Sequence, residues 1–252
     1  MEPWLTLAAR RRPDRVALQG AGEALTYAEL HARARALEVP GGLIEHPPGV
    51  DFAVALHACL LRGVPAVPLD PRLGEAERSA RAAAGGGRGG LLVVHTAGTT
   101  AAPKAVRITA DNVMANALGS AVALGHDRAE RWLCPLPLSH VGGLMVLLRS
   151  VIYATTAIVV PFEVADVAGR LRRGEATLVS LVPTMLGRLL DAGLREPPNL
   201  RLVLLGGAPA APALLKRAAA AGVPMAQTQG ITEGTSQVPV SEAGEHANAG
   251  RP

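Results

Sequence analysis

The sequence predicts an α/β protein whose sheets are largely parallel and flanked by helices. Three observations support this: 49% of the 252 residues are hydrophobic, short apolar runs alternate with segments of helical periodicity, and glycines follow the predicted helices. This apolar content, with a formal net charge of only +4, is enough for a large buried core and excludes a mostly disordered chain. Short apolar runs suit strands that are buried on both faces of a parallel sheet.

The first region, up to about residue 84, is predicted to contain helices joined by short strands. A helix is predicted over residues 28–37, with Thr26 as its N-cap and Glu29 three residues later, as in a capping box. A second helix is predicted over 50–61, where apolar residues recur at helical spacing, and Gly63 ends it.

A strand is predicted over 66–71, and the glycine-rich segment 85–90 that follows is the clearest linker in the chain. Glycine clusters of this kind are typical of loops between structured segments, because they lack side chains that could pack. We therefore predict two coupled subdomains, at about 1–86 and 87–252.

After the linker, strands and helices alternate, as expected for a parallel sheet covered by helices. The predicted strands are 91–94, 131–136, 157–160, 177–181 and 202–205. The predicted helices are 111–124, 164–173, 184–192 and 212–221. The strand at 91–94 is expected to be buried and parallel. Thr109 or Asp111 caps the first of these helices. C-terminal glycines follow the other three, at Gly174, Gly193 and Gly222.

Composition excludes several partners and locations. The isoelectric point is near 9.7, but the basic residues are scattered and aromatics make up only 2%, so no nucleic-acid partner is expected. Cys59 and Cys134 form neither a disulfide framework nor a metal cluster, which favours a reducing cytoplasm. The uncharged stretch 132–148 is interrupted by prolines and glycines, so we expect buried core rather than a membrane span.

The strongest chemical signal is the segment 95–104, His-Thr-Ala-Gly-Thr-Thr-Ala-Ala-Pro-Lys, which follows the strand at 91–94. Small and hydroxylated residues let backbone N–H groups approach a polyphosphate, and a lysine adds a mobile positive charge. Only Lys104 and Lys216 are lysines among 25 basic residues, which makes the position of Lys104 informative. The spacing does not fit a Walker A loop. The alternative is an ordinary surface turn.

This segment resembles the phosphate loop of the superfamily of acyl-CoA synthetases, peptide-synthetase adenylation domains and luciferases, whose pattern is Thr-Ser-Gly-Thr-Thr-Gly-x-Pro-Lys-Gly. Alanines replace one serine and two glycines of that pattern, at Ala97, Ala101 and Ala105. The resemblance implies that the loop binds the β- and γ-phosphates of ATP, through Thr96, Ala97, Gly98, Thr99, Thr100 and Lys104.

The segment 228–233, Thr-Gln-Gly-Ile-Thr-Glu, resembles the Tyr-Gly-x-Thr-Glu motif of the same superfamily. The resemblance implies that Thr232 contacts the α-phosphate and that Glu233 holds Mg²⁺, a cation that prefers carboxylate oxygen. Gln229 and Gly230 also belong to the nucleotide site, although Gln229 replaces the aromatic residue that usually stacks on adenine. The alternative for Glu233 is a solvated loop acid.

Two further turns match the superfamily. The glycine turn Gly206, Gly207 and Ala208 follows a strand and is expected beside adenine and the acyl group. The resemblance implies that the turn with His140 and Gly142 lines the carboxylate tunnel, so His140 is expected to be both a catalytic and a substrate residue. A structural histidine is the alternative, and metal ligation is not expected because no second ligand is near in sequence.

Within the superfamily, residues 143–153, 182–186 and 232–237 look most like the branch that acts on 2-succinylbenzoate in menaquinone biosynthesis. The resemblance implies substrate contacts for Gln237 and for Arg149, which would pair with a second substrate carboxylate. A surface or helix-capping arginine is the alternative for Arg149.

The resemblance implies an enzyme that uses ATP and Mg²⁺ to form an acyl-AMP and then transfers the acyl group to coenzyme A. Because the chain stops at Gly250-Arg251-Pro252, we expect a truncated N-terminal domain without the small C-terminal domain, and weak activity alone. A homodimer is compatible with the sequence. The alternatives are another acyl- or aryl-CoA ligase, a stand-alone adenylation domain, or a non-catalytic nucleotide-binding remnant.

Overall fold

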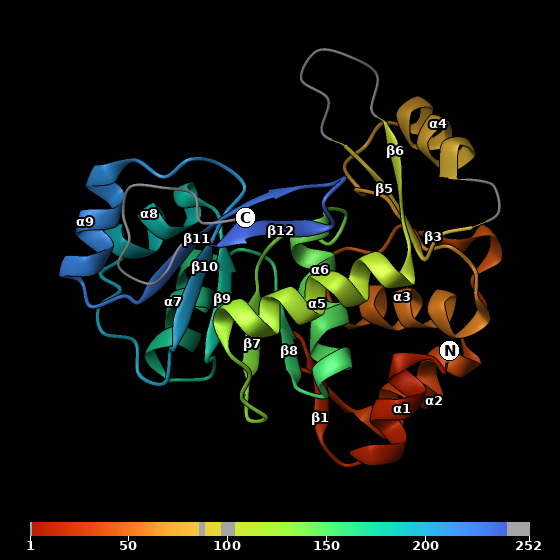
Figure 1. The fold of residues 1–252 in the computed structure, drawn as a ribbon, viewed down its shortest axis with the longest axis horizontal. Coiled ribbons are helices and arrows are strands. Elements are labelled where there is room, and N and C mark those ends of the chain that lie inside the picture. The colour runs from red at the N-terminus through yellow and green to blue at the C-terminus, as the bar shows by residue number, and fades with distance from the viewer. Residues whose placement is uncertain (1, 86–88, 97–103, 241–252) are drawn as a thin grey trace.

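The computed structural model describes residues 2–85, 89–96 and 104–240. Its main feature is an eight-stranded sheet with the order β12-β11-β10-β9-β7-β8-β1-β2 (Figure 1). The strands are β1 (Val16–Gln19), β2 (Ala24–Thr26), β7 (Arg131–Cys134), β8 (Thr156–Val159), β9 (Leu178–Leu181), β10 (Leu202–Leu205), β11 (Met225–Ile231) and β12 (Ser236–Val240). Only the edge strands β2 and β12 pair in antiparallel fashion; the others are parallel. The predicted fold class is confirmed.

Two small sheets lie beside the main one. Strand β3 (Leu43–Ile44) pairs in parallel with β4 (Val67–Pro68). Strand β5 (Leu92–His95) forms an antiparallel hairpin with β6 (Ala105–Ile108). The prediction of a buried strand here is confirmed, but its parallel pairing is wrong except for a single parallel bridge between Ala66 and Leu92. A short apolar run shows that a strand is buried but does not specify its neighbour.

Of the helices in the described residues, six begin and end within one residue of a predicted helix, and no bounds were predicted for the other three. They are α1 (Trp4–Arg11), α2 (Tyr27–Ala36), α3 (Val50–Arg62), α4 (Glu75–Gly85), α5 (Ala110–Leu124), α6 (Val141–Tyr153), α7 (Val164–Arg172), α8 (Pro183–Asp191) and α9 (Pro212–Ala220). Thr26 and Glu29 form the predicted capping box of α2, and Thr109 caps α5. Gly63 ends α3 with a φ of 66°, a left-handed conformation in which glycine is unstrained.

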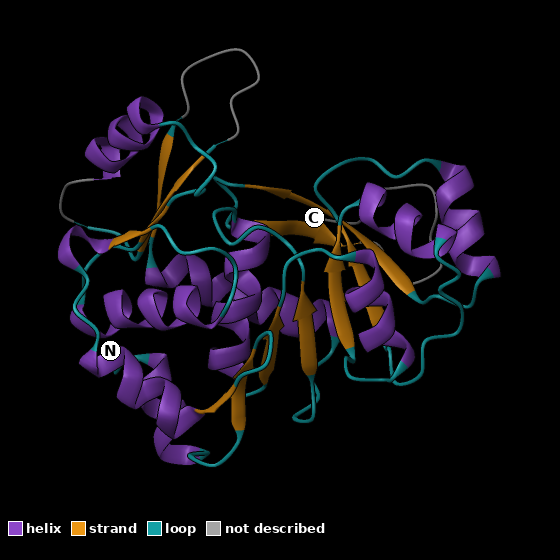
Figure 2. Cartoon of the chain, turned by 180° about the vertical axis from the view of Figure 1, so that it is seen from behind, coloured by secondary structure: helices purple, strands orange, loops and turns teal. Residues whose placement is uncertain are grey.

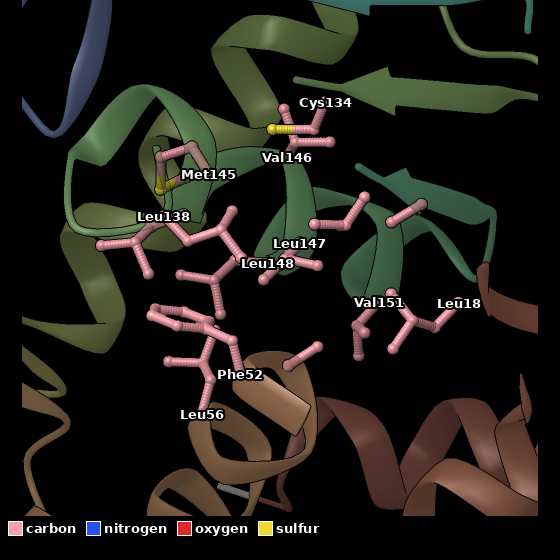
Figure 3. Packing of buried hydrophobic residues seen from close by; sticks show 14 of the residues in the cluster. Leu18, Phe52, Leu56, Cys134, Leu138, Met145, Val146, Leu147, Leu148 and Val151 are labelled. Carbon is pink, nitrogen blue, oxygen red and sulfur yellow. The ribbon is translucent and has the colours of Figure 1, made fainter. Parts of the chain in front are cut away.

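The parallel strands have a hydrophobic core on each face of the sheet. Successive strand side chains point to opposite faces, so Trp132 and Cys134 join one core while Leu133 joins the other. The first core also contains apolar residues of α3 and α6, which pack together in Figure 3. The second contains residues of α7, α8 and α9. Helices therefore cover both faces of the strands (Figure 2), as the apolar strand sequences require.

The helix α6 explains the long uncharged stretch of the sequence. Residues 143–151 are all buried, so the expectation of buried core is correct, although no helix was predicted there. Within the described residues, no helix combines the length and apolar character that crossing a membrane requires.

The sheet and the first core both extend across residue 86. Strand β1 pairs with β8, and Leu30 belongs to the same core as Leu148. The division into subdomains at about 1–86 and 87–252 stays a prediction, and the two parts share a sheet and a core.

Candidate active site

A cavity of about 550 Å³ lies where the parallel strands β7, β9, β10 and β11 end. Its walls come from segments far apart in the sequence: Thr96, residues 136–137 and 140–143, Arg149, residues 180–182, Leu204, Gly206 and Gly207 after β10, Thr228, and residues 230–233. In open α/β sheets, ligands bind outside the carboxyl ends of the strands, because loops and helix N-termini converge there. The cavity is therefore the candidate active site.

The phosphate-loop side of the cavity is the base of the β5–β6 hairpin. Thr96 lines the cavity, and its backbone N–H donates to the carbonyl of Lys104 at 3.0 Å. The backbone N–H of Lys104 in turn donates to the Thr96 hydroxyl at 3.2 Å. These two hydrogen bonds hold Lys104 at the hairpin base, where its side chain is exposed. Residues 97–103, which include four of the predicted phosphate ligands, lie outside the described part of the chain.

The opposite side of the cavity is the turn between β11 and β12. Gly230, Thr232 and Glu233 all line the cavity, and Glu233 is exposed. The resemblance implied a nucleotide-site motif here, with a solvated loop acid as the alternative for Glu233. The structure makes this turn the tip of a hairpin that reaches toward β5 and β6 (Figure 1). Thr96 and Glu233 therefore lie on the walls of one cavity.

The glycine turn after β10 brings backbone close to the cavity. A side chain at Gly206 would come within 2.8 Å of the Thr228 methyl carbon, so the turn and β11 approach too closely for a larger residue. Gly207 has a φ of +81°, which strains any other residue. Both glycines line the cavity, as does Gly142.

His140 is the N-cap residue of α6 and lies on the cavity wall. Desolvation lowers the pKa of His140, Asp70 opposes that shift, and Arg81 and Arg72 add to it. The imidazole is therefore neutral at neutral pH and offers one donor and one acceptor. A side chain at Gly143 would lie 2.6 Å from the Pro137 carbonyl oxygen, which shows how tightly the start of α6 packs on this turn.

Arg149 occupies another part of the cavity wall and is only 1% exposed. It lies inside α6, so the surface and helix-capping interpretations are both wrong. Burial lowers the pKa of Arg149 to about 10, which leaves it protonated at neutral pH. No ion pair joins Arg149 to a carboxylate within the described ranges. A buried, unpaired cation facing a cavity is well suited to bind an anionic group.

Several predicted site residues have no place on this wall. Lys104, Ala208 and Gln229 are described but do not line the cavity, and Gln237 lies in β12 with its side chain outside the described part. Conversely, Ser180, Val182 and Thr228 line the cavity without having been predicted as site residues. Ser180 and Thr228 lie within β9 and β11, and Val182 directly follows β9, so only the strand order brings them together.

Comparisons with known proteins agree with this geometry. The family described as AMP-binding enzyme matches residues 90–252. A 2-succinylbenzoate–CoA ligase from Bacillus subtilis (strain 168) is 32% identical over 93% of this chain and 59% of its own length. The counterpart from Bacillus licheniformis is 30% identical over 93% of this chain and 60% of its own.

Solved structures give the same result. The chain matches o-succinylbenzoate CoA synthetase (MenE) from Bacillus subtilis in complex with the acyl-adenylate intermediate OSB-AMP, with a TM-score of 0.88 and 30% identity over 95% of this chain and 60% of that chain. The same enzyme in complex with ATP and magnesium ion matches with a TM-score of 0.87 and 29% identity, over 100% of this chain and 65% of that one. The chain thus spans about three-fifths of the length of these relatives.

Proposed function

Because this chain belongs to the AMP-binding enzyme family, we propose that it is the nucleotide- and acid-binding part of a 2-succinylbenzoate–CoA ligase. The observation that carries the proposal is the shared cavity of Thr96, Thr232 and Glu233, with Arg149 on the same wall. The curated relatives carry this ligase name, and the whole reaction is proposed on that basis.

In the proposed reaction, a carboxylate oxygen attacks the α-phosphorus of ATP. A new P–O bond forms, the bond to the β-phosphate breaks, and pyrophosphate leaves. The thiol of coenzyme A then attacks the acyl carbonyl and AMP leaves. Two anions meet in the first step, so the protein must mainly neutralise charge and hold the attacking oxygen in line. No general base is needed, because the carboxylate is already ionised.

The proposed roles of the individual residues are as follows. The loop from Thr96 to Thr100, with Lys104, binds the β- and γ-phosphates, and Thr232 contacts the α-phosphate. Gly206 and Gly207 let backbone lie against the adenylate. His140 and Gly142 line the acid's path, and Arg149 binds the second carboxylate of 2-succinylbenzoate.

Glu233 is the proposed protein ligand of Mg²⁺. No group of three or more His, Cys, Asp or Glu side chains that could hold a metal ion occurs among the described residues. A single carboxylate fits Mg²⁺ that arrives with the nucleotide, because this ion keeps water and phosphate oxygens as its other ligands. When bound, Mg²⁺ neutralises phosphate charge.

Isothermal titration calorimetry with Mg·ATP tests the nucleotide site. Lys104→Met is expected to weaken binding roughly 10-fold or more, because a charge-assisted hydrogen bond to phosphate is lost. Lys216→Met is the matched control: this other lysine is exposed on α9, and its loss is expected to leave the Kd unchanged. Equal effects of the two substitutions would contradict the proposal.

Acid-dependent exchange of pyrophosphate into ATP tests the chemistry. We expect weak exchange with 2-succinylbenzoate from this chain and none from Glu233→Gln, whereas Glu163→Gln, an exposed acid at the start of α7, keeps it. Stronger exchange with other aryl acids would favour a different acyl-CoA ligase or an adenylation domain. Nucleotide binding without any exchange, even when a C-terminal domain is supplied, would favour a non-catalytic remnant.

A further inference from the structure

The guanidinium of Arg149 is held by two neutral side chains from other elements. Its Nε and Nη2 donate to the Asn116 side-chain oxygen at 3.2 and 2.5 Å. Its other contact is the Trp132 ring, whose centroid lies 5.5 Å from the guanidinium carbon. Asn116 comes from α5 and Trp132 from β7, so three separate elements fix one cation.

These partners orient the charge without cancelling it. Arginine carries five N–H donors, and Asn116 accepts from two of its nitrogens, which leaves donors for a ligand. An aspartate in place of Asn116 would form a bidentate ion pair and satisfy the cation internally. An asparagine supplies the same acceptor geometry with no negative charge.

Trp132 is itself fixed in place. Its indole Nε1–H donates to the Ser180 hydroxyl at 2.9 Å, and Ser180 lines the cavity beside Arg149. Asn116 does not line the cavity, and its hydrogen bonds to Arg149 connect it to the cavity wall.

We propose that Asn116 is a positioning residue that determines specificity: it holds Arg149 as an uncompensated cation, so the cavity prefers an acid with a second carboxylate. This inference rests on the proposed function and extends it. The substrate class it implies is a dicarboxylic acid in which one carboxylate is activated and the other pairs with Arg149. A monocarboxylic acid of the same shape would leave the cation unpaired.

Asn116→Asp tests the inference, because it changes charge with almost no change of shape. The probes are OSB-AMS, a stable analogue of the acyl-adenylate, and the same molecule without the ring carboxylate. Calorimetry on the full chain is expected to show a preference of roughly 30-fold for OSB-AMS. In Asn116→Asp this preference is expected to disappear, while the Kd of the probe without the ring carboxylate stays within about twofold.

Controls separate the proposed role from general damage. Ala115→Asp adds the same carboxylate at an exposed neighbouring position of α5 and is expected to keep the full preference. Asn116→Ser, which retains a neutral acceptor, should keep most of it and serves if Asn116→Asp does not fold. A purely structural role for Asn116 would weaken both probes equally.

The positioning role and the proposed function fail on different results. A preference that persists in Asn116→Asp would overturn the positioning role, and so would its loss in Ala115→Asp. If the wild-type chain binds both probes equally well, or binds neither, the proposed dicarboxylate function itself fails. The wild-type measurement therefore tests the function, and the two variants test the positioning role.

Discussion

Two buried charged side chains, Glu130 and Arg149, are satisfied in different ways. Glu130 is 4% exposed and directly precedes β7. Arg201 donates to one of its carboxylate oxygens at 2.9 and 2.5 Å, and the Thr177 hydroxyl donates to the other at 2.5 Å. Arg149 is 1% exposed, and its acceptor Asn116 is neutral.

The difference separates a structural charge from a functional one. A buried charge with an opposite charge and hydrogen bonds on both oxygens is already satisfied and ties its elements together. A buried charge with only neutral partners keeps most of its capacity to bind an ion. Glu130 therefore joins the strands at the amino end of β7, and Arg149 is available to a ligand in the cavity.

The largest expected effect comes from breaking the satisfied pair. Arg201→Met leaves Glu130 buried without a counter-ion, so the free energy of unfolding is expected to fall by about 3 kcal/mol. Urea denaturation measures this. Arg217→Met is the control, because it breaks an exposed ion pair with Asp191 and is expected to change stability by less than about 1 kcal/mol. Equal losses in both variants would show that Glu130 is not specially dependent on Arg201.

Removing the unsatisfied charge of Arg149 should lower ligand affinity and leave the free energy of unfolding unchanged or higher. Arg149→Met is expected to lower the affinity for OSB-AMS roughly 30-fold, because a charge-assisted hydrogen bond is lost. Stability should stay constant or rise, since an unpaired buried charge is replaced by an apolar side chain. Calorimetry and urea denaturation of the same preparation check both. A large loss of stability with unchanged affinity would reverse the assignment.

Trp132→Phe tests whether the Trp132 ring helps to orient the guanidinium of Arg149. It removes the hydrogen bond to Ser180 and part of the cation–π contact, together about 1 kcal/mol. The expected result is roughly a fivefold loss of the preference for OSB-AMS over the analogue without the ring carboxylate. Unchanged preference would show that Asn116 alone orients the guanidinium.

The smallest expected effect is on pH dependence. The pKa of Arg149 is lowered to about 10 by burial, so its charge is present below that pH and is lost as the pH rises through it. The preference for OSB-AMS should therefore be constant from pH 7 to 9 and fall by about half near pH 10. Titrations of both probes at each pH measure the ratio. A ratio that is still constant above pH 10 would contradict a role for this charge.

Much of the fold could be predicted because its signals are local. The capping box of Thr26 and Glu29 and the left-handed glycine at residue 63 lie within one helical turn of the ends they define. The apolar run Leu202–Leu205 is the strand β10 residue for residue. The antiparallel pairing of β5 could not be predicted in this way, because β6 is short and mostly not buried, and it pairs through its backbone.

The candidate site was predicted best where a motif is contiguous. Thr96, Gly206, Gly207, Thr232 and Glu233 belong to short motifs, and all of them line the cavity. Arg149 was ambiguous because a charged residue in an apolar segment usually faces solvent. Its contact with Asn116 joins residues 33 positions apart in sequence, and no spacing rule relates two packed helices.

A crystal structure of this chain with OSB-AMS tests the central claim most directly. We expect the nucleotide part of OSB-AMS to lie between Thr96, the turn at Gly206 and Gly207, and the hairpin tip at Glu233, with the ring carboxylate on Arg149. A ligand bound elsewhere, for example in the separate cavity lined by His46, Phe52 and Met185, would contradict it.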